Sequence, residues 1–116
     1  MPLDQFKLGA VGSPPSAPRS LVMKRLRSVE PQIVAIYRKD IRRMMLKNGK
    51  PNYNKYADYL DNEDIVGTID SLAKRVTGLH IDQIDEMDNN GLINLTERAF
   101  NKAVRLEGGK LSDWQP

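Results

Sequence analysis

The chain has no cysteine and only one histidine, His80, among its 116 residues. The absence of cysteine excludes disulfide bonds and thiolate metal sites. A single histidine argues against a zinc site and against catalysis by an imidazole base, so we interpret His80 as a residue at the start of a short helix. The sequence also lacks a glycine-rich phosphate-binding loop and a nucleophile elbow.

Carboxylates are frequent in residues 58–88, but the helical periodicity places them on outer faces, where the surroundings do not tune a carboxylate for catalysis. An enzyme is therefore the class of protein that the sequence favours least, and we expect no cofactor.

Long apolar runs are also missing. No stretch approaches the roughly 20 residues that a helix needs to cross a bilayer. The first residues, MPLDQFKLGAVGSPPSAP, have neither the basic start nor the apolar core of a secretion signal. We therefore expect neither a membrane-spanning segment nor a secretion signal.

The net charge of +3 conceals a separation of charge along the chain. Residues 1–55 hold twelve Lys or Arg against three Asp or Glu, a net +9, whereas residues 56–116 hold six against twelve, a net −6. Such asymmetry is typical of a protein that binds a polyanion, or of one whose basic end meets the acidic end of another copy.

Apolar residues recur at intervals of three and four through residues 20–109, and no strand pattern competes with this periodicity. The sequence predicts an all-α protein, a small bundle of four to five helices, with an extended N-terminal arm over residues 1–19 and a short C-terminal tail over residues 110–116. Helical stretches, some of them short, are expected over 21–27 after an N-cap at Ser20, from an N-cap at Ser28 to about Lys47, and over 54–60, 63–77, 81–87 and 91–106.

Basic side chains gather on the first two helical stretches and the turn that follows. They are Lys24, Arg25, Arg27, Arg38, Lys39, Arg42, Arg43, Lys47 and Lys50. Cations near a helix C-terminus complement the helix dipole, so part of this set has a purely structural explanation. The functional explanations are contact with another subunit and contact with nucleic-acid phosphates, which weakens steeply with salt. Because no aromatic platform or helix-turn-helix spacing accompanies these cations, the sequence favours solvated or subunit-facing charge over nucleic-acid contact.

Both terminal segments carry apolar residues suited to docking on a partner. In the arm these are Leu3, Phe6, Leu8 and Val11, among glycines and prolines that block helix and central strand alike. The arm is either a disordered tail or an extended segment that pairs with a neighbour. In the tail, Trp114 either anchors the C-terminus in a partner's pocket, since tryptophan is enriched at binding hot spots, or folds back on its own core.

A polar turn near residue 90 has the spacing of a calcium-binding helix–loop–helix loop. Glu86, Asp88, Asn90, Leu92 and Glu97 fall at positions 1, 3, 5, 7 and 12 of such a loop. Position 1 departs from the pattern, which requires Asp. The helix phase also disagrees, because Asp85 stands where an apolar residue should precede the loop and Arg98 stands where the exiting helix should be buried. The sequence therefore favours a capped polar turn over a calcium site.

Residues 77–106 resemble a segment of the tail-assembly chaperones of tailed phages. The resemblance is carried by Thr77-Gly78-Leu79, Ile84-Asp85, Met87-Asp88 and Leu92 to Leu95. In that family a helix ends in T-G-L, a short helix carries I/V-D-x-L-D, and a further helix follows. The resemblance implies a small phage assembly protein, located in the virion or in the host cytoplasm.

We therefore expect a non-enzymatic structural or assembly protein of a larger particle, a tailed-phage virion or tail-assembly component that contacts other protein subunits as a homo- or hetero-oligomer. The alternative is a nucleic-acid-associated basic helical protein. A single calcium-binding helix–loop–helix is a third, lesser interpretation.

Overall fold

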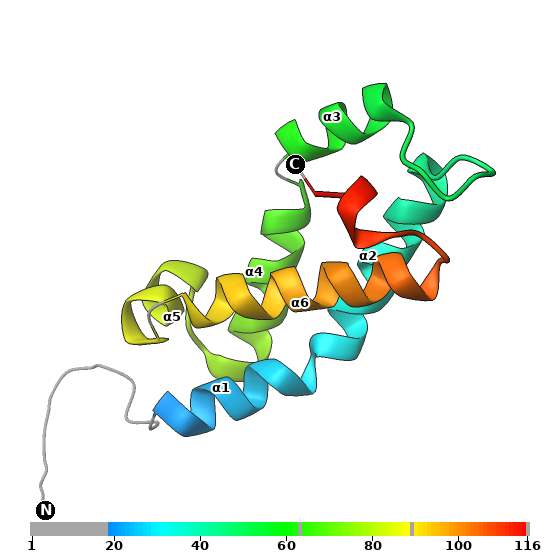
Figure 1. The fold of residues 1–116 in the computed structure, drawn as a ribbon. Helices are drawn as coiled ribbons and strands as arrows, with labels where there is room; N and C mark the ends of the chain where they lie inside the picture. Colours follow the sequence, from blue (N-terminus) through cyan, green and yellow to red (C-terminus); the bar gives the residue numbers. More distant parts are fainter. Residues whose placement is uncertain (1–18, 63, 89, 116) are drawn as a thin grey trace, which may run out of the picture.

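The computed structural model describes residues 19–62, 64–88 and 90–115, and these ranges form α-helices joined by short turns (Figure 1). The elements are α1 (Arg19–Ser28), α2 (Glu30–Met44), α3 (Tyr53–Asp61), α4 (Asp64–Thr77), α5 (Ile81–Asp88), α6 (Gly91–Leu106) and a short 3-10 helix, η1 (Leu111–Asp113). In the described ranges the only pairing of extended backbone is one bridge between Met45 and Pro51. The predicted all-α class is confirmed, but the described part of the chain has six α-helices where four to five were expected.

α6 lies along α2, and α1, α5 and η1 also pack against it (Figure 1). The buried stripe of α6 includes Leu92, Leu95 and Ala99, as its spacing predicts. Burying a leucine or isoleucine side chain stabilises a fold by about 1.5–3 kcal/mol, so these buried residues contribute substantially to stability. The most completely buried side chains of the core are Val22, Leu26, Ile33, Ile41, Ala73, Ile84, Leu95, Ala99, Ala103, Val104 and Trp114.

The junction between α1 and α2 differs from the predicted one. α1 begins at Arg19, so Ser20 lies inside the helix and is not its N-cap. Ser28 is not the N-cap of α2 either, because it ends α1 and its hydroxyl donates to the carbonyl of Arg25 at 2.5 Å. Val29 takes the cap position of α2 and buries its side chain. Burial of an apolar residue at the bend therefore replaces a side-chain cap.

The helix α2 ends before its predicted limit at Lys47. Met45 leaves the helix in an extended conformation and pairs with Pro51. Between them the chain turns at Gly49, whose φ of +85° is a left-handed conformation that glycine adopts without a Cβ penalty. Lys47 and Lys50 therefore lie on a turn and not on the outer face of α2.

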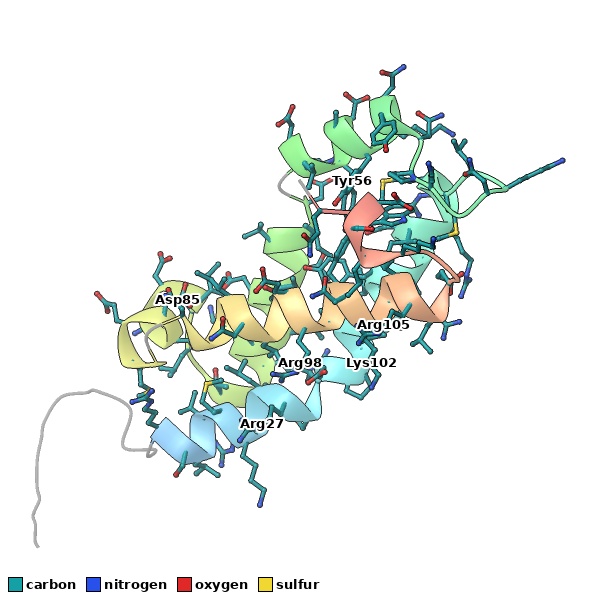
Figure 2. The ribbon with its side chains drawn as sticks, in the orientation of Figure 1. Arg27, Tyr56, Asp85, Arg98, Lys102 and Arg105 are labelled. Carbon is teal, nitrogen blue, oxygen red and sulfur yellow. The ribbon has the colours of Figure 1, made fainter. Side chains whose placement is uncertain are left out.

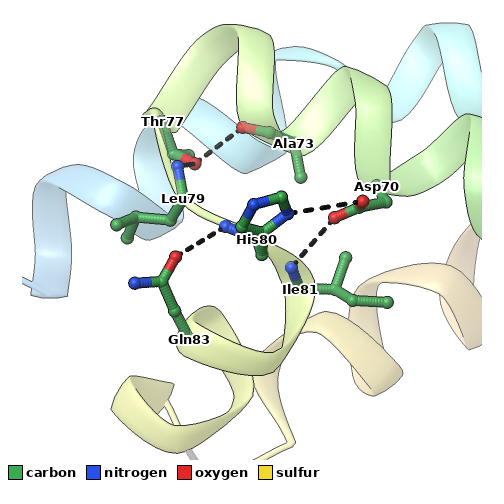
Figure 3. Close-up of polar contacts among 7 residues, drawn as sticks. All are labelled: Asp70, Ala73, Thr77, Leu79, His80, Ile81 and Gln83. Carbon is green, nitrogen blue, oxygen red and sulfur yellow. Dashed lines mark hydrogen bonds and ion pairs between the residues drawn. The ribbon is translucent and has the colours of Figure 1, made fainter.

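Side chains stabilise the end of α4 and the turn that follows it (Figure 3). The hydroxyl of Thr77 donates to the carbonyl of Ala73 at 2.6 Å and accepts from the N–H of Leu79 at 3.1 Å. Leu79 is buried, so the turn is fixed both by hydrogen bonds and by packing.

The start of α5 is held by α4 (Figure 3). Asp70 accepts from the N–H of Ile81 at 3.1 Å, which satisfies a donor in the first turn of α5 that has no partner within the helix. His80 directly precedes α5, and Gln83 accepts its N–H at 3.0 Å. The interpretation of His80 as a residue at a helix start is confirmed. None of the helices in the described ranges is both long enough and apolar enough to traverse a bilayer.

Candidate functional site

The C-terminal segment folds back on the bundle and buries Trp114, which is 1% exposed. Its indole Nε1 donates to the carbonyl of Gly49 at 3.0 Å, and its own carbonyl accepts from the hydroxyl of Tyr56. Gly109 leaves room for the indole, because a Cβ at that position would lie 2.8 Å from Nε1. Of the two interpretations of Trp114, packing on its own core is the one observed. This side chain is not available to anchor a partner.

Trp114 belongs to an aromatic cluster between α2, α3 and α6. Tyr56 lies edge-on to Trp114 with ring centroids 5.3 Å apart, and parallel to Phe100 at 6.4 Å. Tyr37 meets Phe100 edge-on at 5.3 Å. Such aromatic pairs contribute about 0.5–1.5 kcal/mol beyond the area that they bury. Tyr56 is therefore a packing residue, whereas Tyr53 on the same helix is exposed.

An apolar groove of about 540 Å³ opens beside this cluster, between the α3–α4 junction and α6. We call it the α3–α6 groove. Leu60, Val66 and Ile93 line it although they are 48%, 45% and 53% exposed. A single exposed apolar residue is ordinary in a folded protein, but three that line one groove form the kind of patch that marks an interaction site.

A smaller hollow of about 210 Å³ continues the groove toward α5 and shares Val66 and Ile93 with it. Asp85 of α5 lines this hollow, and its Oδ1 is buried without a hydrogen-bond partner in the described part of the chain. Burial, and then the negative charge of Asp82, raise the pKa of Asp85. We count this hollow as part of the α3–α6 groove, whose lining then includes Tyr56 of α3 and Asp85 of α5, both labelled in Figure 2. Sequence reasoning missed the groove, because its residues come from α2, α3, α4, α6 and the C-terminal segment and meet only in the folded chain.

The tyrosines of the groove keep their protons. Burial, and then the charge of Asp40, raise the pKa of Tyr37 to about 12, and the same two causes raise the pKa of Tyr59. Neither side chain forms a phenolate near neutral pH, so neither is prepared to act as a nucleophile or a base. These tyrosines therefore line the groove as neutral phenols.

Three of the predicted basic residues form ion pairs within the chain. Arg38 and Arg42 donate through Nε to the two carboxylate oxygens of Glu107, at 2.6 and 2.9 Å. The hydrogen bonds from Arg42 and then Arg38 lower the pKa of Glu107. Arg43 pairs with Asp40 on its own helix. Because α6 returns alongside α2, part of the charge separation seen along the sequence is neutralised inside the fold.

The remaining predicted cations are exposed, and the fold adds others that sequence reasoning missed. The exposed ones are Lys24, Arg25, Arg27, Lys39, Lys47 and Lys50. Lys102 and Arg105 project from the exposed side of α6, and Lys102 lines a hollow together with Arg27 of α1 (Figure 2). We call Arg27, Lys102 and Arg105 the basic patch; within the described residues none of them forms an ion pair. The spacing of four and three from Arg98 to Lys102 and Arg105 is a sequence signal that could have found it.

The structure contradicts the calcium-loop interpretation, because the required residues are not in a loop. Glu86 and Asp88 belong to α5, while Leu92 and Glu97 belong to α6. Leu92 is the first buried residue of α6, so a residue that the calcium loop would need is part of a helix and its core. Asn90 holds the cap position with φ of +73°, and its side chain forms no capping hydrogen bond with α6. Among the described residues, no three His, Asp or Glu side chains are grouped so that they could hold a metal ion.

The arm residues Leu3, Phe6, Leu8 and Val11 lie outside the described residues. Their role as docking residues stays a prediction.

No protein-family model matches this chain, and no curated protein or solved structure is significantly similar to it.

Proposed function

We propose that this protein is a non-enzymatic structural or assembly subunit of a larger particle, and that it binds other protein subunits, including copies of itself, through the α3–α6 groove. The observation that carries this proposal is the exposure of Leu60, Val66 and Ile93 around one groove. Covering apolar surface stabilises a complex by about 25 cal/mol per Å², so these side chains favour association. Thr96 and Asn101 also line the groove and offer polar groups that orient a partner.

We propose further that the particle is a tailed phage, which places the protein in the virion or the host cytoplasm. Support comes from residues 77–106. The helix α4 ends at Thr77, α5 carries Ile84-Asp85 and Met87-Asp88, and α6 follows, in the order described for the tail-assembly chaperone segment.

Size-exclusion chromatography with light scattering tests the protein-contact function. The wild type is expected to exceed the mass of a monomer as concentration rises. The double variant Val66→Ser, Ile93→Ser is expected to remain monomeric with unchanged helix content, because both side chains are exposed in the free protein. Leu46→Ser is the matched control, since Leu46 is 46% exposed but lies on the turn after α2, outside the groove. A wild type that is monomeric at every concentration would contradict the proposal.

A second candidate function is association with nucleic acid through the basic patch. Arg27, Lys102 and Arg105 are exposed cations from α1 and α6 that form no ion pair within the described residues. Phosphate contacts of this kind give affinity without base readout. The logarithm of the binding constant falls linearly with the logarithm of the salt concentration.

Retention on a DNA column across a salt gradient distinguishes this second function. If the basic patch binds phosphate, the triple variant Arg27→Gln, Lys102→Gln, Arg105→Gln elutes at lower salt than the wild type. The control Lys47→Gln, Lys50→Gln removes exposed cations elsewhere and should elute with the wild type. Elution of the wild type below roughly 100 mM salt indicates too few phosphate contacts and rules this function out.

A further inference from the structure

The α3–α6 groove sets requirements for what fills it. Its two connected hollows of about 540 and 210 Å³ have room for several side chains but not for the body of a helix. At the α5 end, the buried Oδ1 of Asp85 has no donor in the described part of the chain. Leaving such an oxygen unsatisfied is unfavourable, so an occupant that brings a hydrogen-bond donor is preferred. The groove therefore suits an extended apolar segment that carries a hydrogen-bond donor.

The N-terminal arm has this chemistry. Residues 3–11 read LDQFKLGAV, with Phe6 and Leu8 flanking Lys7, the single cation of residues 1–18. Phenylalanine and leucine side chains suit the apolar part of the groove. The long aliphatic stem of a lysine can follow an apolar surface while its ammonium group reaches a carboxylate such as that of Asp85.

The position of α1 determines which grooves the arm can reach. Residues 12–18 join the arm to α1 and span at most about 25 Å when extended. Because α1 packs against α5, which lines the smaller hollow, this link is long enough to reach the Asp85 end of the groove in its own copy. It is equally long enough to reach that end of the groove in a second copy whose α5 lies beside the start of α1.

Charge complementarity favours the arrangement with a second copy. The helix α1 exposes Lys24 and Arg25 and contains no acidic residue, whereas α5 exposes Asp82 and Glu86 and contains no basic one. Setting α1 of one copy beside α5 of the next brings opposite charges together, and it delivers the arm to the end of the groove where Asp85 lies. Such a head-to-tail contact produces a ring or a filament.

We propose that the α3–α6 groove of one copy binds residues 3–11 of the N-terminal arm of a second copy, with Lys7 paired to Asp85. The proposal rests on the protein-contact function above and names the partner of the same groove.

NMR on mixed full-length proteins tests this pairing. The observed chain is ¹⁵N-labelled and carries Phe6→Ser and Leu8→Ser, so that its own arm does not compete; unlabelled wild type is then added. The amide signals of Val66, Ile93 and Asp85 are expected to shift, and that of Leu46 is not. Adding the unlabelled Phe6→Ser, Leu8→Ser variant in place of wild type should produce no shift.

A double-mutant cycle tests the ion pair. Lys7→Gln in the unlabelled chain and Asp85→Asn in the labelled chain are each expected to weaken binding about ten-fold, and the two together little more than either alone. Asp58→Asn, which changes an exposed carboxylate of α3 outside both hollows, should leave the affinity unchanged. Additive effects of Lys7→Gln and Asp85→Asn would overturn the pairing of these residues.

Light scattering separates failure of this inference from failure of the proposed function. If wild type associates but the groove signals do not shift, the groove binds something other than the arm of a second copy, and the inference is overturned while the protein-contact function stands. A wild type that neither associates nor shifts those signals contradicts both.

Discussion

Trp114 connects three parts of the chain that are distant in sequence. Its indole reaches the turn after α2 through Gly49, and its carbonyl receives the hydroxyl of Tyr56 on α3. The sequence alone left two roles open for this residue, because a terminal tryptophan satisfies either a partner or its own core. Trp114 packs on its own core because Gly109 leaves space for the indole. This space exists only once the chain has folded.

Replacing Trp114 by alanine is expected to lower the free energy of unfolding by about 3–5 kcal/mol, because it empties a fully buried site. Tyr56→Phe should lower it by about 1–3 kcal/mol, since a buried carbonyl then loses its donor. Urea denaturation followed by far-ultraviolet circular dichroism measures both. Tyr53→Phe is the matched control and should change little, as Tyr53 is 65% exposed. Equal effects of the two tyrosine substitutions would show that the hydrogen bond to Trp114 contributes nothing.

Glu107 predicts how stability depends on pH. Its pKa in the folded protein lies below the ordinary value of 4.5 because Arg42 and Arg38 donate to it. The stabilisation is therefore fully present above pH 4.5 and is lost as the pH falls through the lowered pKa of the folded state. Wild type is expected to be more stable than Glu107→Gln near neutral pH, and the difference should shrink in acid. Denaturation of both proteins at a series of pH values measures it; parallel curves would contradict the role of the arginines.

At the scale of the helices, local pattern was a good guide to what is buried and a poorer guide to where elements end. The stripe of Leu92, Leu95 and Ala99 was readable because the interior accepts one face of a helix. The end of α2 was not, because its last turn competes with the pairing of Met45 and Pro51. The prediction of one continuous basic face failed for a related reason. Glu107, which pairs with Arg38, lies 69 residues away in the sequence.

Two glycines in different settings predict opposite effects of the same substitution. Gly67 lies in α4, exposed, with no atom within 4 Å of where a Cβ would stand. Gly67→Ala should therefore raise the free energy of unfolding by up to about 1 kcal/mol, the difference in helix propensity. At Gly109 a Cβ would meet the indole of Trp114, so Gly109→Ala should destabilise the protein. Thermal denaturation compares them, and a shift in the same direction for both would contradict the packing described around Trp114.

For the molecule as a whole, the way the helices pack determines the charge distribution more than the order of charges along the sequence does. The net +9 and −6 of the two sequence halves suggested two oppositely charged ends, but α6 returns along α2 and brings Glu107 to Arg38 and Arg42. The groove was beyond sequence reasoning for the same reason. Its three exposed apolar side chains, Leu60, Val66 and Ile93, come from α3, α4 and α6, and no local pattern links them.

Because α6 contacts α1, α2, α5 and η1, we expect the helices to unfold as one cooperative unit. Trp114 is the only tryptophan, so its fluorescence reports on the C-terminal segment and α3, while circular dichroism reports on all helices. The two signals should give the same midpoint in urea. Separate midpoints would show that the segment around Trp114 opens independently of α1, α4 and α5.

The packing of α2 against α6 also determines when the core of the polypeptide can form during folding. Three helices separate these partners in the sequence, so closing the intervening loop precedes the burial of Ile33 and Ile41. During synthesis on the ribosome, the apolar face of α2 emerges first. It stays exposed until α6, against which it packs, has been synthesised. A nascent chain of this topology therefore acquires its interior late and all at once, which makes the interval before α6 emerges its period of greatest exposure to aggregation and to chaperones.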